Sequence, residues 1–573
     1  MCFFSATDNL WGRDLWVSDG TPEGTHSLRK GKARDTILLG VSGGKLYFQA
    51  DDPALGWEPW VSDGTTAGTH MVRDVCPGVC SSLPSPPCAN GCPFEPAPSV
   101  GYRGKFFFVA DDDEHGRELW ISDGTETGTL LMADLCEGSC SSAPNSLAVF
   151  RDALYFLADD GVHGEEVWRS DGTTGGTMLF AELRPGPLDD SPGWIVPVAD
   201  RFFYVLGSGC GQPLCAWRSD GTATGTRLTH ELFPDGFHHF LTDLVVAGTN
   251  VFWLESFEES LDAALWGSAS SAVGFQRLLL ARATSLLAAL PDGRVFLRIE
   301  EDDGSPAELW VSDGTAAGTQ RIAAANPAFS HDATRASAAV LGDQIVFVTG
   351  AHQEPRSLWV SDGSAAGTRK IADVSATGTS SSPQRLASRG EQLFFNASTA
   401  NSFPLWASDG SAAGTTILSE PLRPQHWIAL GDRLVFNTGT RQGGVLGVTD
   451  GTAAGTSRFD ADFNVRGAMA VLGEQVFSAA GATGQQLWAS DGTEAGTRLI
   501  RTVSGASGPF PELPGSLTPL GSNLLFIAFD GPETPRLWRS DGTPSGTIPI
   551  KTFSPCQGCL EPTAAPPRSH RAG

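Results

Sequence analysis

Leu15–Thr25 reads LWVSDGTPEGT, and the same pattern returns along almost the whole chain. Clear copies are PWVSDGTTAGT from Pro59, LWISDGTETGT from Leu119, LWVSDGTAAGT from Leu309 and LWRSDGTPSGT from Leu537. The chain carries twelve copies, of which the sixth, LWGSASSAVGF from Leu265, has lost the Asp-Gly step. The period is about 47 residues, which is typical of propeller blades and longer than most helical repeats.

Each repeat contains four strand-like pieces joined by turn sequences. The last copy shows them as LTPL, LLFIA, RLWRS and TIPIKTF, with GSN and DGTPSGT as turns. Four short strands joined by hairpins make one blade, so we predict an all-β chain of twelve four-stranded β-propeller blades. We expect two tandem propellers, residues 1–285 with an incomplete first blade and residues 286–555, then a disordered Pro-rich tail, residues 556–573.

The SDGTxxGT element predicts a preformed turn between the third and fourth strands. Asp accepts hydrogen bonds from backbone amides downstream, and Gly tolerates positive φ. We expect the second Gly, as in Gly24, to need an unusual backbone conformation as well. The structural turn aspartates are Asp19, Asp63, Asp123, Asp171, Asp220, Asp313, Asp362, Asp409, Asp450, Asp491 and Asp541.

A tryptophan at the second motif position accounts for 11 of the 16 in the chain. We expect this ring to wedge between neighbouring blades, with its N–H bonded to a turn carbonyl. Copy ten carries Gly447 at this position, which predicts the loosest blade.

The chain resembles bacterial proteins that carry the ELWxxDGT repeat. RELWISDGTETGT around Trp120 and AELWVSDGTAAGT around Trp310 match the pattern in full, and the resemblance extends over nearly all of residues 1–555. It implies an exported β-propeller and no particular activity.

The cysteines are grouped in close pairs, which favours disulfides that close loops, and hence an oxidising, extracytoplasmic compartment. A zinc site formed by the first four is the alternative, and free thiols are a third. The pairs are Cys76 with Cys80, Cys88 with Cys92, Cys136 with Cys140, Cys210 with Cys215, and Cys556 with Cys559, which leaves Cys2 alone.

Acidic loops precede two motifs, in ADDDEHGRELW and ADDGVHGEEVW. Asp111, Asp113, Asp159 and Asp160 are candidate calcium ligands because clustered carboxylates suit this cation, although solvated hairpin loops with turn-forming aspartates are the favoured explanation. Apart from the zinc alternative above, calcium is the only cofactor that we consider.

Catalysis has little support, and we identify no catalytic residue or cofactor-binding motif. His238 and His239 stand outside the repeat, but a structural role is favoured for them. Three of the four tyrosines lie in predicted strands, and Tyr102 lies in a turn, which does not suit a sialidase-type nucleophile.

The formal net charge of −26 argues against nucleic acid and anionic membranes as partners. No stretch is apolar enough to span a bilayer. The chain begins with the second strand of a blade and shows no signal peptide, so we expect that upstream repeats and an export signal are missing. We predict a non-enzymatic, extracytoplasmic binding or adhesion scaffold for a protein or glycan at the cell surface. The alternatives are a secreted hydrolase or lyase and a structural surface-layer component.

Overall fold

The computed structural model of the 573-residue chain describes most of the repeats. The described residues are 1–6, 14–29, 35–84, 97–183, 192–198, 202–207, 215–231, 239–257, 262–268, 276–282, 285–299, 307–322, 338–349, 357–374, 384–397, 404–419, 424–438, 444–459, 465–480, 485–504, 517–529 and 535–553. They divide between two compact units, one formed by Met1–Asp235 with Pro514–Gly573 and the other by Gly236–Leu513.

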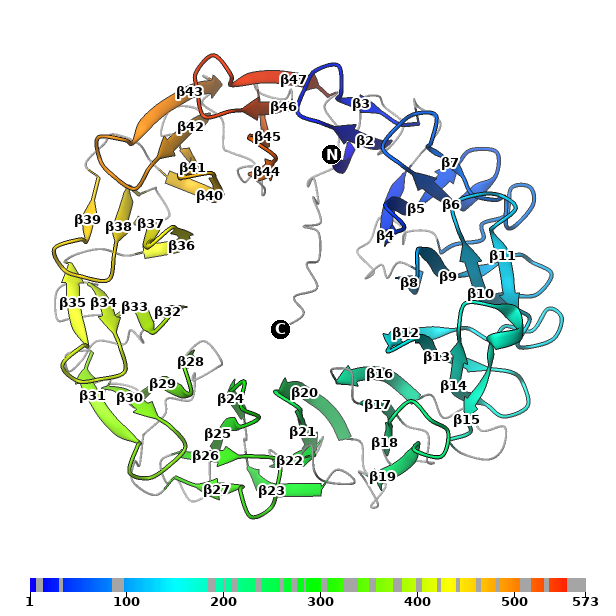
Figure 1. Ribbon diagram of the computed structural model, residues 1–573, viewed down its shortest axis with the longest axis horizontal. Coiled ribbons are helices and arrows are strands. Elements are labelled where there is room, and N and C mark those ends of the chain that lie inside the picture. Colours follow the sequence, from blue (N-terminus) through cyan, green and yellow to red (C-terminus); the bar gives the residue numbers. More distant parts are fainter. Residues whose placement is uncertain are drawn as a thin grey trace. The chain divides into compact units, whose positions relative to one another are not determined.

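The first unit holds blades 1 to 5 and blade 12 (Figure 1). Its strands are β1 (Cys2–Ala6), β2 (Asp14–Ser18), β3 (His26–Ser27); β4 (Thr36–Ser42), β5 (Lys45–Asp52), β6 (Gly56–Ser62), β7 (His70–Met71); β8 (Ser99–Tyr102), β9 (Lys105–Asp111), β10 (Arg117–Ser122), β11 (Leu130–Ala133); β12 (Asn145–Phe150), β13 (Ala153–Asp159), β14 (Glu165–Ser170), β15 (Met178–Ala181); β16 (Pro192–Val198), β17 (Phe202–Gly207), β18 (Cys215–Ser219), β19 (Arg227–Glu231); and β44 (Thr518–Leu520), β45 (Asn523–Phe529), β46 (Pro535–Ser540), β47 (Ile548–Thr552).

The second unit holds blades 6 to 11. Its strands are β20 (His239–Ala247), β21 (Asn250–Phe257), β22 (Asp262–Ser268), β23 (Gln276–Arg282); β24 (Ser285–Ala289), β25 (Val295–Ile299), β26 (Glu308–Ser312), β27 (Gln320–Arg321); β28 (Ala338–Leu341), β29 (Gln344–Thr349), β30 (Ser357–Ser361), β31 (Arg369–Asp373); β32 (Gln384–Arg389), β33 (Gln392–Asn396), β34 (Leu405–Ser408), β35 (Thr416–Ser419); β36 (Pro424–Leu430), β37 (Arg433–Thr438), β38 (Leu446–Thr449), β39 (Ser457–Arg458); and β40 (Val465–Leu472), β41 (Gln475–Ala480), β42 (Gln485–Ser490), β43 (Arg498–Ser504).

Every sheet is an antiparallel meander in chain order, which is the topology of a propeller blade. Eleven sheets have four strands and the first has three. Within each unit the first strands of several successive blades contact one another, as β4 contacts β8 and β28 contacts β32. The only helix in the described residues is the short 3₁₀ turn η1 (Thr174–Gly176). The sheets therefore confirm the predicted β-propeller fold with twelve blades.

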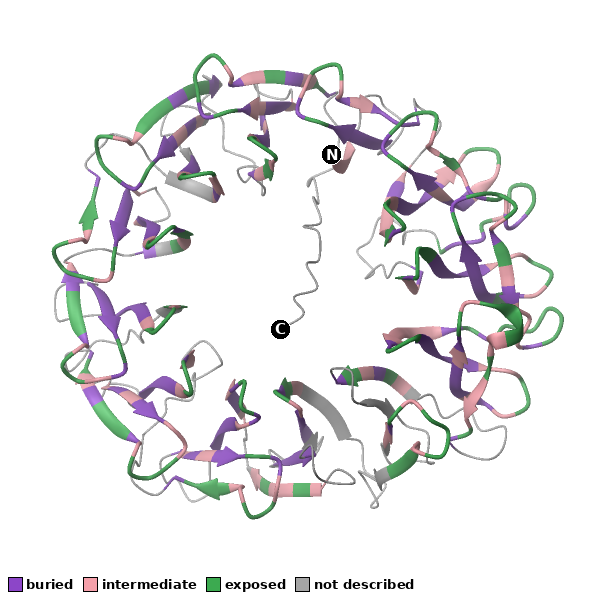
Figure 2. Cartoon of the chain, viewed as in Figure 1, coloured by how far each residue is buried: buried purple, intermediate pink, exposed green. Residues whose placement is uncertain are grey.

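The second and third strands carry the core of each blade, and the turns are exposed (Figure 2). In β9 the pattern KFFFVAD is buried from Phe106 to Ala110, because both faces of the strand pack against neighbouring blades. The sequences of these strands are therefore continuous apolar runs and do not alternate between apolar and polar residues.

The motif tryptophan wedges between blades, as predicted. Trp120 of blade 3 lies in one cluster with Tyr47 and Val61 of blade 2, and Trp168 of blade 4 packs with Phe107 of blade 3. The prediction for the indole N–H is wrong at five described places. Three of these tryptophans donate to side chains, Trp266 to Glu255, Trp310 to Glu308 and Trp488 to Gln486. The other two donate to backbone carbonyls, Trp16 to Ala6 at 3.2 Å and Trp168 to Ala158 at 3.1 Å. These carbonyls belong to β1 and β13, the strands that precede the motif strand in each blade, and not to the turn.

Blade 10, which lacks the tryptophan, still forms a four-stranded sheet. A Cβ at Gly447 would come within 2.3 Å of the ring of Phe436, which is fully buried. Trp427 lies beside Phe436 with ring centroids 5.4 Å apart. Aromatic rings from the first and second strands therefore occupy the space beside Gly447.

Blade 12 packs against blade 1 in the first unit. Trp16 and Phe553 meet edge to face with ring centroids 5.1 Å apart, and the Lys551 ammonium lies 4.6 Å from the Trp16 ring. The unit boundaries, at residues 235/236 and 513/514, are consequently not at residue 285 as the sequence suggested. The division into two propellers of six blades stays a prediction, and the expected disordered tail lies outside the described residues.

Candidate functional site

The eleven SDGTxxGT turns share one hydrogen-bond pattern, which makes their aspartates structural. In the first turn the Asp19 Oδ1 atom accepts from the Thr21 N–H at 2.8 Å and from the Thr21 hydroxyl at 2.7 Å. The hydroxyl and backbone of Thr21 lower the pKa of Asp19. The same bonds form at Asp63, Asp123, Asp171, Asp220, Asp313, Asp362, Asp409, Asp450, Asp491 and Asp541.

The second glycine of each turn is required for a different reason from the one predicted. Gly20 has a φ of +89°, but Gly24 is not among the glycines with positive φ. A Cβ at Gly24 would lie 2.0 Å from the Asp19 Oδ1 atom. The position must be glycine because the carboxylate packs directly against its Cα.

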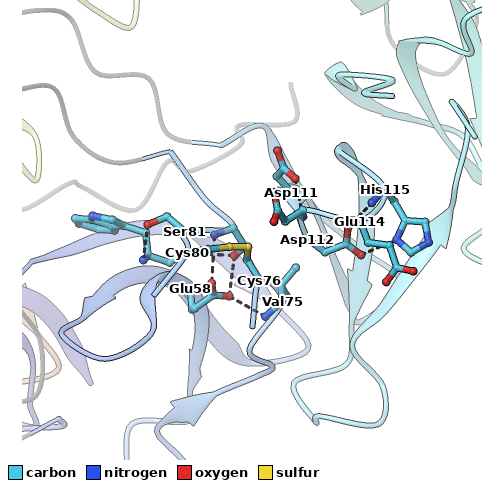
Figure 3. Close-up of a disulfide and its surroundings, with 12 residues drawn as sticks. Glu58, Val75, Cys76, Cys80, Ser81, Asp111, Asp112, Glu114 and His115 are labelled. Carbon is cyan, nitrogen blue, oxygen red and sulfur yellow. Dashed lines mark hydrogen bonds and ion pairs between the residues drawn. A yellow bond between two sulfur atoms is a disulfide. The ribbon is translucent and has the colours of Figure 1, made fainter. Parts of the chain in front are cut away.

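Blades 2 to 4 carry loops of a different kind at the strand ends that lie opposite the SDGTxxGT turns. We define the loop face as residues 74–84 and 134–144, which follow the fourth strands of blades 2 and 3, with residues 112–116 and 160–164, the hairpins of blades 3 and 4. Two disulfides close the first two loops: Cys76–Cys80, which Figure 3 shows, and Cys136–Cys140. Their Cα atoms are 5.6 and 5.2 Å apart, within the usual range. Two of the five predicted disulfides are thus confirmed, and the other three stay predictions.

A buried glutamate anchors each disulfide loop at both ends. The Glu58 carboxylate accepts from the Val75 N–H at 2.9 Å, from the Ser82 N–H at 3.2 Å and from the Ser82 hydroxyl at 2.7 Å. Glu118 makes the same bonds to Leu135 and Ser142 in the next blade. Burial raises the pKa of Glu58 to about 7, against the lowering effect of these donors.

Each disulfide loop is also bonded to the hairpin of the following blade. The Asp111 N–H donates to the Ser82 carbonyl at 2.9 Å, and the Asp159 N–H to the Ser142 carbonyl at 3.0 Å. Gly161 lies so close to the second disulfide that a Cβ there would be 2.9 Å from the Cys136 Sγ atom. A continuous path of contacts therefore joins the blade, its loop and the next hairpin.

Each of the two hairpins contains an Asp–His pair of its own. Asp112 accepts from the His115 N–H at 2.7 Å and contacts the ring Nδ1 at 2.7 Å (Figure 3). Asp160 and His163 repeat this arrangement, with backbone and ring distances of 2.8 and 2.6 Å. The hydrogen bond to Asp112 raises the pKa of His115, and the one to Asp160 raises that of His163.

The candidate calcium ligands take part in these turns. Asp111 accepts from the Asp113 N–H at 2.9 Å, and Asp159 accepts from the Gly161 N–H at 2.8 Å. Asp160 is engaged with His163, and the Asp113 carboxylate is exposed. In the described part of the chain, no three His, Cys, Asp or Glu side chains are grouped so as to hold a metal ion. Calcium binding stays a prediction.

Other predicted residues are outside the described residues or are used structurally. Cys88, Cys92, Cys210, Cys556, Cys559 and His238 are not described, and Cys215 and His239 are described only as members of β18 and β20. The four-cysteine zinc alternative is wrong for Cys76 and Cys80, because they pair with each other. Tyr47 and Tyr155 are buried between blades, where burial raises their pKa values.

Sequence reasoning missed the anchoring role of Glu58 and Glu118 and the pairing of Asp with His in the hairpins. A signal for each was present: Glu precedes the motif in GWEPW and GRELW, and Asp stands three residues before His in both hairpins. The partners of the glutamates lie 17 and 24 residues downstream, so only the folded loops reveal them.

No protein-family model and no curated protein matches the chain. Among solved structures, it is similar to a prolyl endopeptidase at 10% identity and a TM-score of 0.28, covering 61% of this chain and 54% of that one. It is similar to the tricorn protease at 10% identity and a TM-score of 0.25, covering 96% and 58% of the two chains. The propeller domain of the Trilobed protease from Pyrococcus furiosus gives 12% identity, a TM-score of 0.25 and coverages of 54% and 97%.

The chain thus spans little more than half the length of the two peptidases. Similarities this low carry no argument about activity, and the fold assignment rests on the sheets described above. In the described residues, no helix is long and apolar enough to cross a membrane.

Proposed function

We propose that the chain is an exported, non-enzymatic binding scaffold that uses the loop face to bind a protein or glycan at the cell surface. The observation that carries this proposal is the bracing of the loops of blades 2 and 3. Each is closed by a disulfide, anchored by a buried glutamate and bonded to the next hairpin. Loops held rigidly on a scaffold lose little entropy when a partner binds.

The loop face exposes side chains that differ from those of the repeated SDGTxxGT turns. Val79 and Val162 are 83% and 64% exposed, and the charged neighbours Asp113, Glu114 and Glu137 are also exposed. Apolar side chains within a polar rim are typical of binding surfaces. The two disulfides support an extracytoplasmic location, since such bonds persist in oxidising compartments. The resemblance to exported ELWxxDGT-repeat proteins supports the same proposal.

The test is retention of the fluorescently labelled, oxidised full chain on a panel of intact Gram-negative and Gram-positive bacterial cells. We expect saturable retention that is lost in a Val79→Glu/Val162→Glu double variant and kept in a Val41→Glu variant. Treating the cells with periodate or with protease shows whether a glycan or a protein is bound. Retention that never saturates, or that the double variant leaves unchanged, would overturn the proposal. Conversion of the bound material would favour a hydrolase or lyase instead.

A further inference from the structure

The loop face is strongly acidic. It contains no lysine or arginine and seven carboxylates, those of Asp74, Asp112, Asp113, Glu114, Asp134, Glu137 and Asp160. Two basic residues adjoin it in sequence: Arg73 donates to the Thr129 carbonyl at 3.0 Å, and Arg117 is exposed. Among the described residues, no lysine or arginine therefore forms an ion pair with the carboxylates of this surface.

Three of these carboxylates are unpaired as well as exposed. Asp113, Glu114 and Glu137 make no side-chain hydrogen bond or ion pair with any described residue. At the other ends of the strands, basic side chains bond to the turns, as Lys45 donates to the Asp123 carbonyl at 2.9 Å. The loop face instead holds like charges together on braced loops, and a cationic partner would relieve their repulsion.

Apolar side chains on the same surface are a second, independent feature. Val79 is 83% exposed, the highest value for a large apolar side chain in the described part of the chain, and Val162 is 64% exposed. Water solvates carboxylates without help from such side chains, so an acidic loop that served only solubility would gain nothing from them. Exposed apolar groups beside unpaired charges are typical of a surface that a partner covers.

Hydrogen bonds place these groups on one continuous surface. Each disulfide loop is bonded to the hairpin of the next blade, as described above. Within blade 3, the Arg117 N–H directly after the hairpin donates to the Ser141 hydroxyl of the loop at 3.0 Å. The path thus runs from the loop of blade 2 to the hairpin of blade 4 (Figure 1). Val79 lies in its first segment and Val162 in its last, and the exposed carboxylates come between them.

We propose that the partner of the loop face is a cationic polypeptide segment in which Lys or Arg side chains are interspersed with apolar ones. This inference rests on the proposed use of the loop face for binding and adds the chemistry of the partner. In the complex, the basic side chains lie against Asp113, Glu114 and Glu137, and the apolar ones cover Val79 and Val162. A neutral glycan leaves the carboxylates without cationic partners, and an anionic glycan is repelled. The charge of the loop face therefore favours a protein over a glycan.

The probe is a fluorescently labelled peptide in which Lys and Arg alternate with Val and Leu, and its binding to the oxidised full chain is followed by anisotropy. We expect saturable binding that weakens by about tenfold or more between about 0.05 and 0.5 M NaCl, because salt screens exposed charges. Two control peptides separate charge from apolar contact. A peptide with Gln and Ser in place of Lys and Arg, and one with Ser in place of Val and Leu, should each bind at least about fivefold more weakly.

Two matched variants separate the charge of the loop face from the charge of the whole chain. Glu114→Gln/Glu137→Gln removes two unpaired carboxylates and should weaken peptide binding by about fivefold. Glu23→Gln/Glu126→Gln removes the same charge from exposed positions in the SDGTxxGT turns of blades 1 and 3, and should change binding by less than about twofold. The six residues of β10 separate the turn of blade 3 from the loop face by about 20 Å, which exceeds the screening length at physiological salt. All four side chains are exposed, so neither variant threatens the fold.

Three peptide results would overturn the inference: no saturable binding, equal effects of the two double variants, or equal binding of the cationic and the neutral peptide. On the cells that test the proposed function, retention that periodate abolishes and salt leaves unchanged would assign the loop face to a glycan and would likewise overturn it. That result would leave the proposed function standing, because the loop face would still bind a surface partner. Absence of saturable retention on cells would instead remove the proposed function, and the peptide measurements would still decide the inference about charge.

Discussion

At the scale of single residues, the repeat reveals which atoms each turn needs. Asp-Gly chemistry predicted the turns at all eleven aspartates, because the bonds involved lie within six residues of one another. It did not predict why the second glycine is needed, since that depends on where the carboxylate packs after the turn has formed. Local hydrogen bonding can thus be deduced from a sequence motif, whereas close packing within the same motif cannot.

Gly175 and Gly176 offer a test of this packing within one turn. A Cβ at Gly176 would lie 2.1 Å from the Asp171 Oδ1 atom, and a Cβ at Gly175 would meet nothing within 4 Å. We expect Gly176→Ala to lower the free energy of unfolding by about 1–3 kcal/mol, because the carboxylate must move and loses its turn bonds. Gly175→Ala should change it by less than about 0.5 kcal/mol. Urea unfolding of both variants measures the difference, and equal effects would contradict the packing argument.

The buried Glu58 carboxyl predicts a pH dependence of stability. Burial raises its pKa from 4.5 to about 7, so the folded chain binds this proton more tightly than the unfolded chain does. The sign follows: the contribution of Glu58 to stability falls as the pH rises from about 4.5 to 7, by up to about 3 kcal/mol. The Glu58→Gln variant cannot titrate and is the reference. Unfolding free energies of the two proteins between pH 4.5 and 8 should converge toward alkaline pH or cross, and a constant difference would show that Glu58 does not titrate in this range.

At the scale of elements, the loop face depends on contacts between consecutive repeats. The sequence predicted the cysteine pairs from their spacing, but not that Glu58 and Ser82 join one blade to the hairpin of the next. Such contacts arise only when two blades pack together, and a single repeat contains one half of each. The tryptophans that wedge between blades were predictable because the same residue recurs at the same motif position in almost every repeat.

The Cys136–Cys140 disulfide should rigidify the hairpin of blade 4 as well as its own loop. Replacing both cysteines by serine should cost about 2 kcal/mol, the entropy of closing a five-residue loop. We expect faster amide exchange at residues 160–164, since Gly161 packs against the disulfide. Cys2→Ser is the control, because Cys2 is not in either disulfide described here. Exchange that accelerates only within residues 136–140 would show that the disulfide acts locally.

At the scale of the whole chain, the first unit joins sequence segments from both ends. The predicted boundary at residue 285 followed composition, which carries no signal for the packing of Phe553 on Trp16. Phe553→Ala should therefore cost about 3–5 kcal/mol and speed amide exchange in β1 and β2, more than 500 residues away in sequence. Met178→Ala, at an exposed position on a fourth strand, should have little effect. Unchanged exchange in β1 would contradict the joining of the two ends through this contact.

The repetition of one turn also predicts how the chain responds to acid. Hydrogen bonds from the residue two places downstream lower the pKa values of ten turn aspartates below 3.8, those of Asp19, Asp63, Asp123, Asp171, Asp220, Asp362, Asp409, Asp450, Asp491 and Asp541. A lowered pKa means that the folded chain releases these protons more readily than the unfolded chain does. Stability from the turns is therefore fully present above pH 3.8 and is lost as the pH falls through the folded-state values.

Because the aspartates belong to separate blades, their small contributions should add, and the melting temperature should fall steeply below pH 4. Calorimetry from pH 5 to pH 2.5 measures this fall, and its steepness reports how many protons are taken up on unfolding. A variant with Asp→Asn at Asp362, Asp409, Asp450 and Asp491 removes four titrating turns of the second unit, so its melting temperature should depend less steeply on pH. If the slope were unchanged, other carboxylates would govern acid unfolding and the turns would hold their shape whether ionised or protonated.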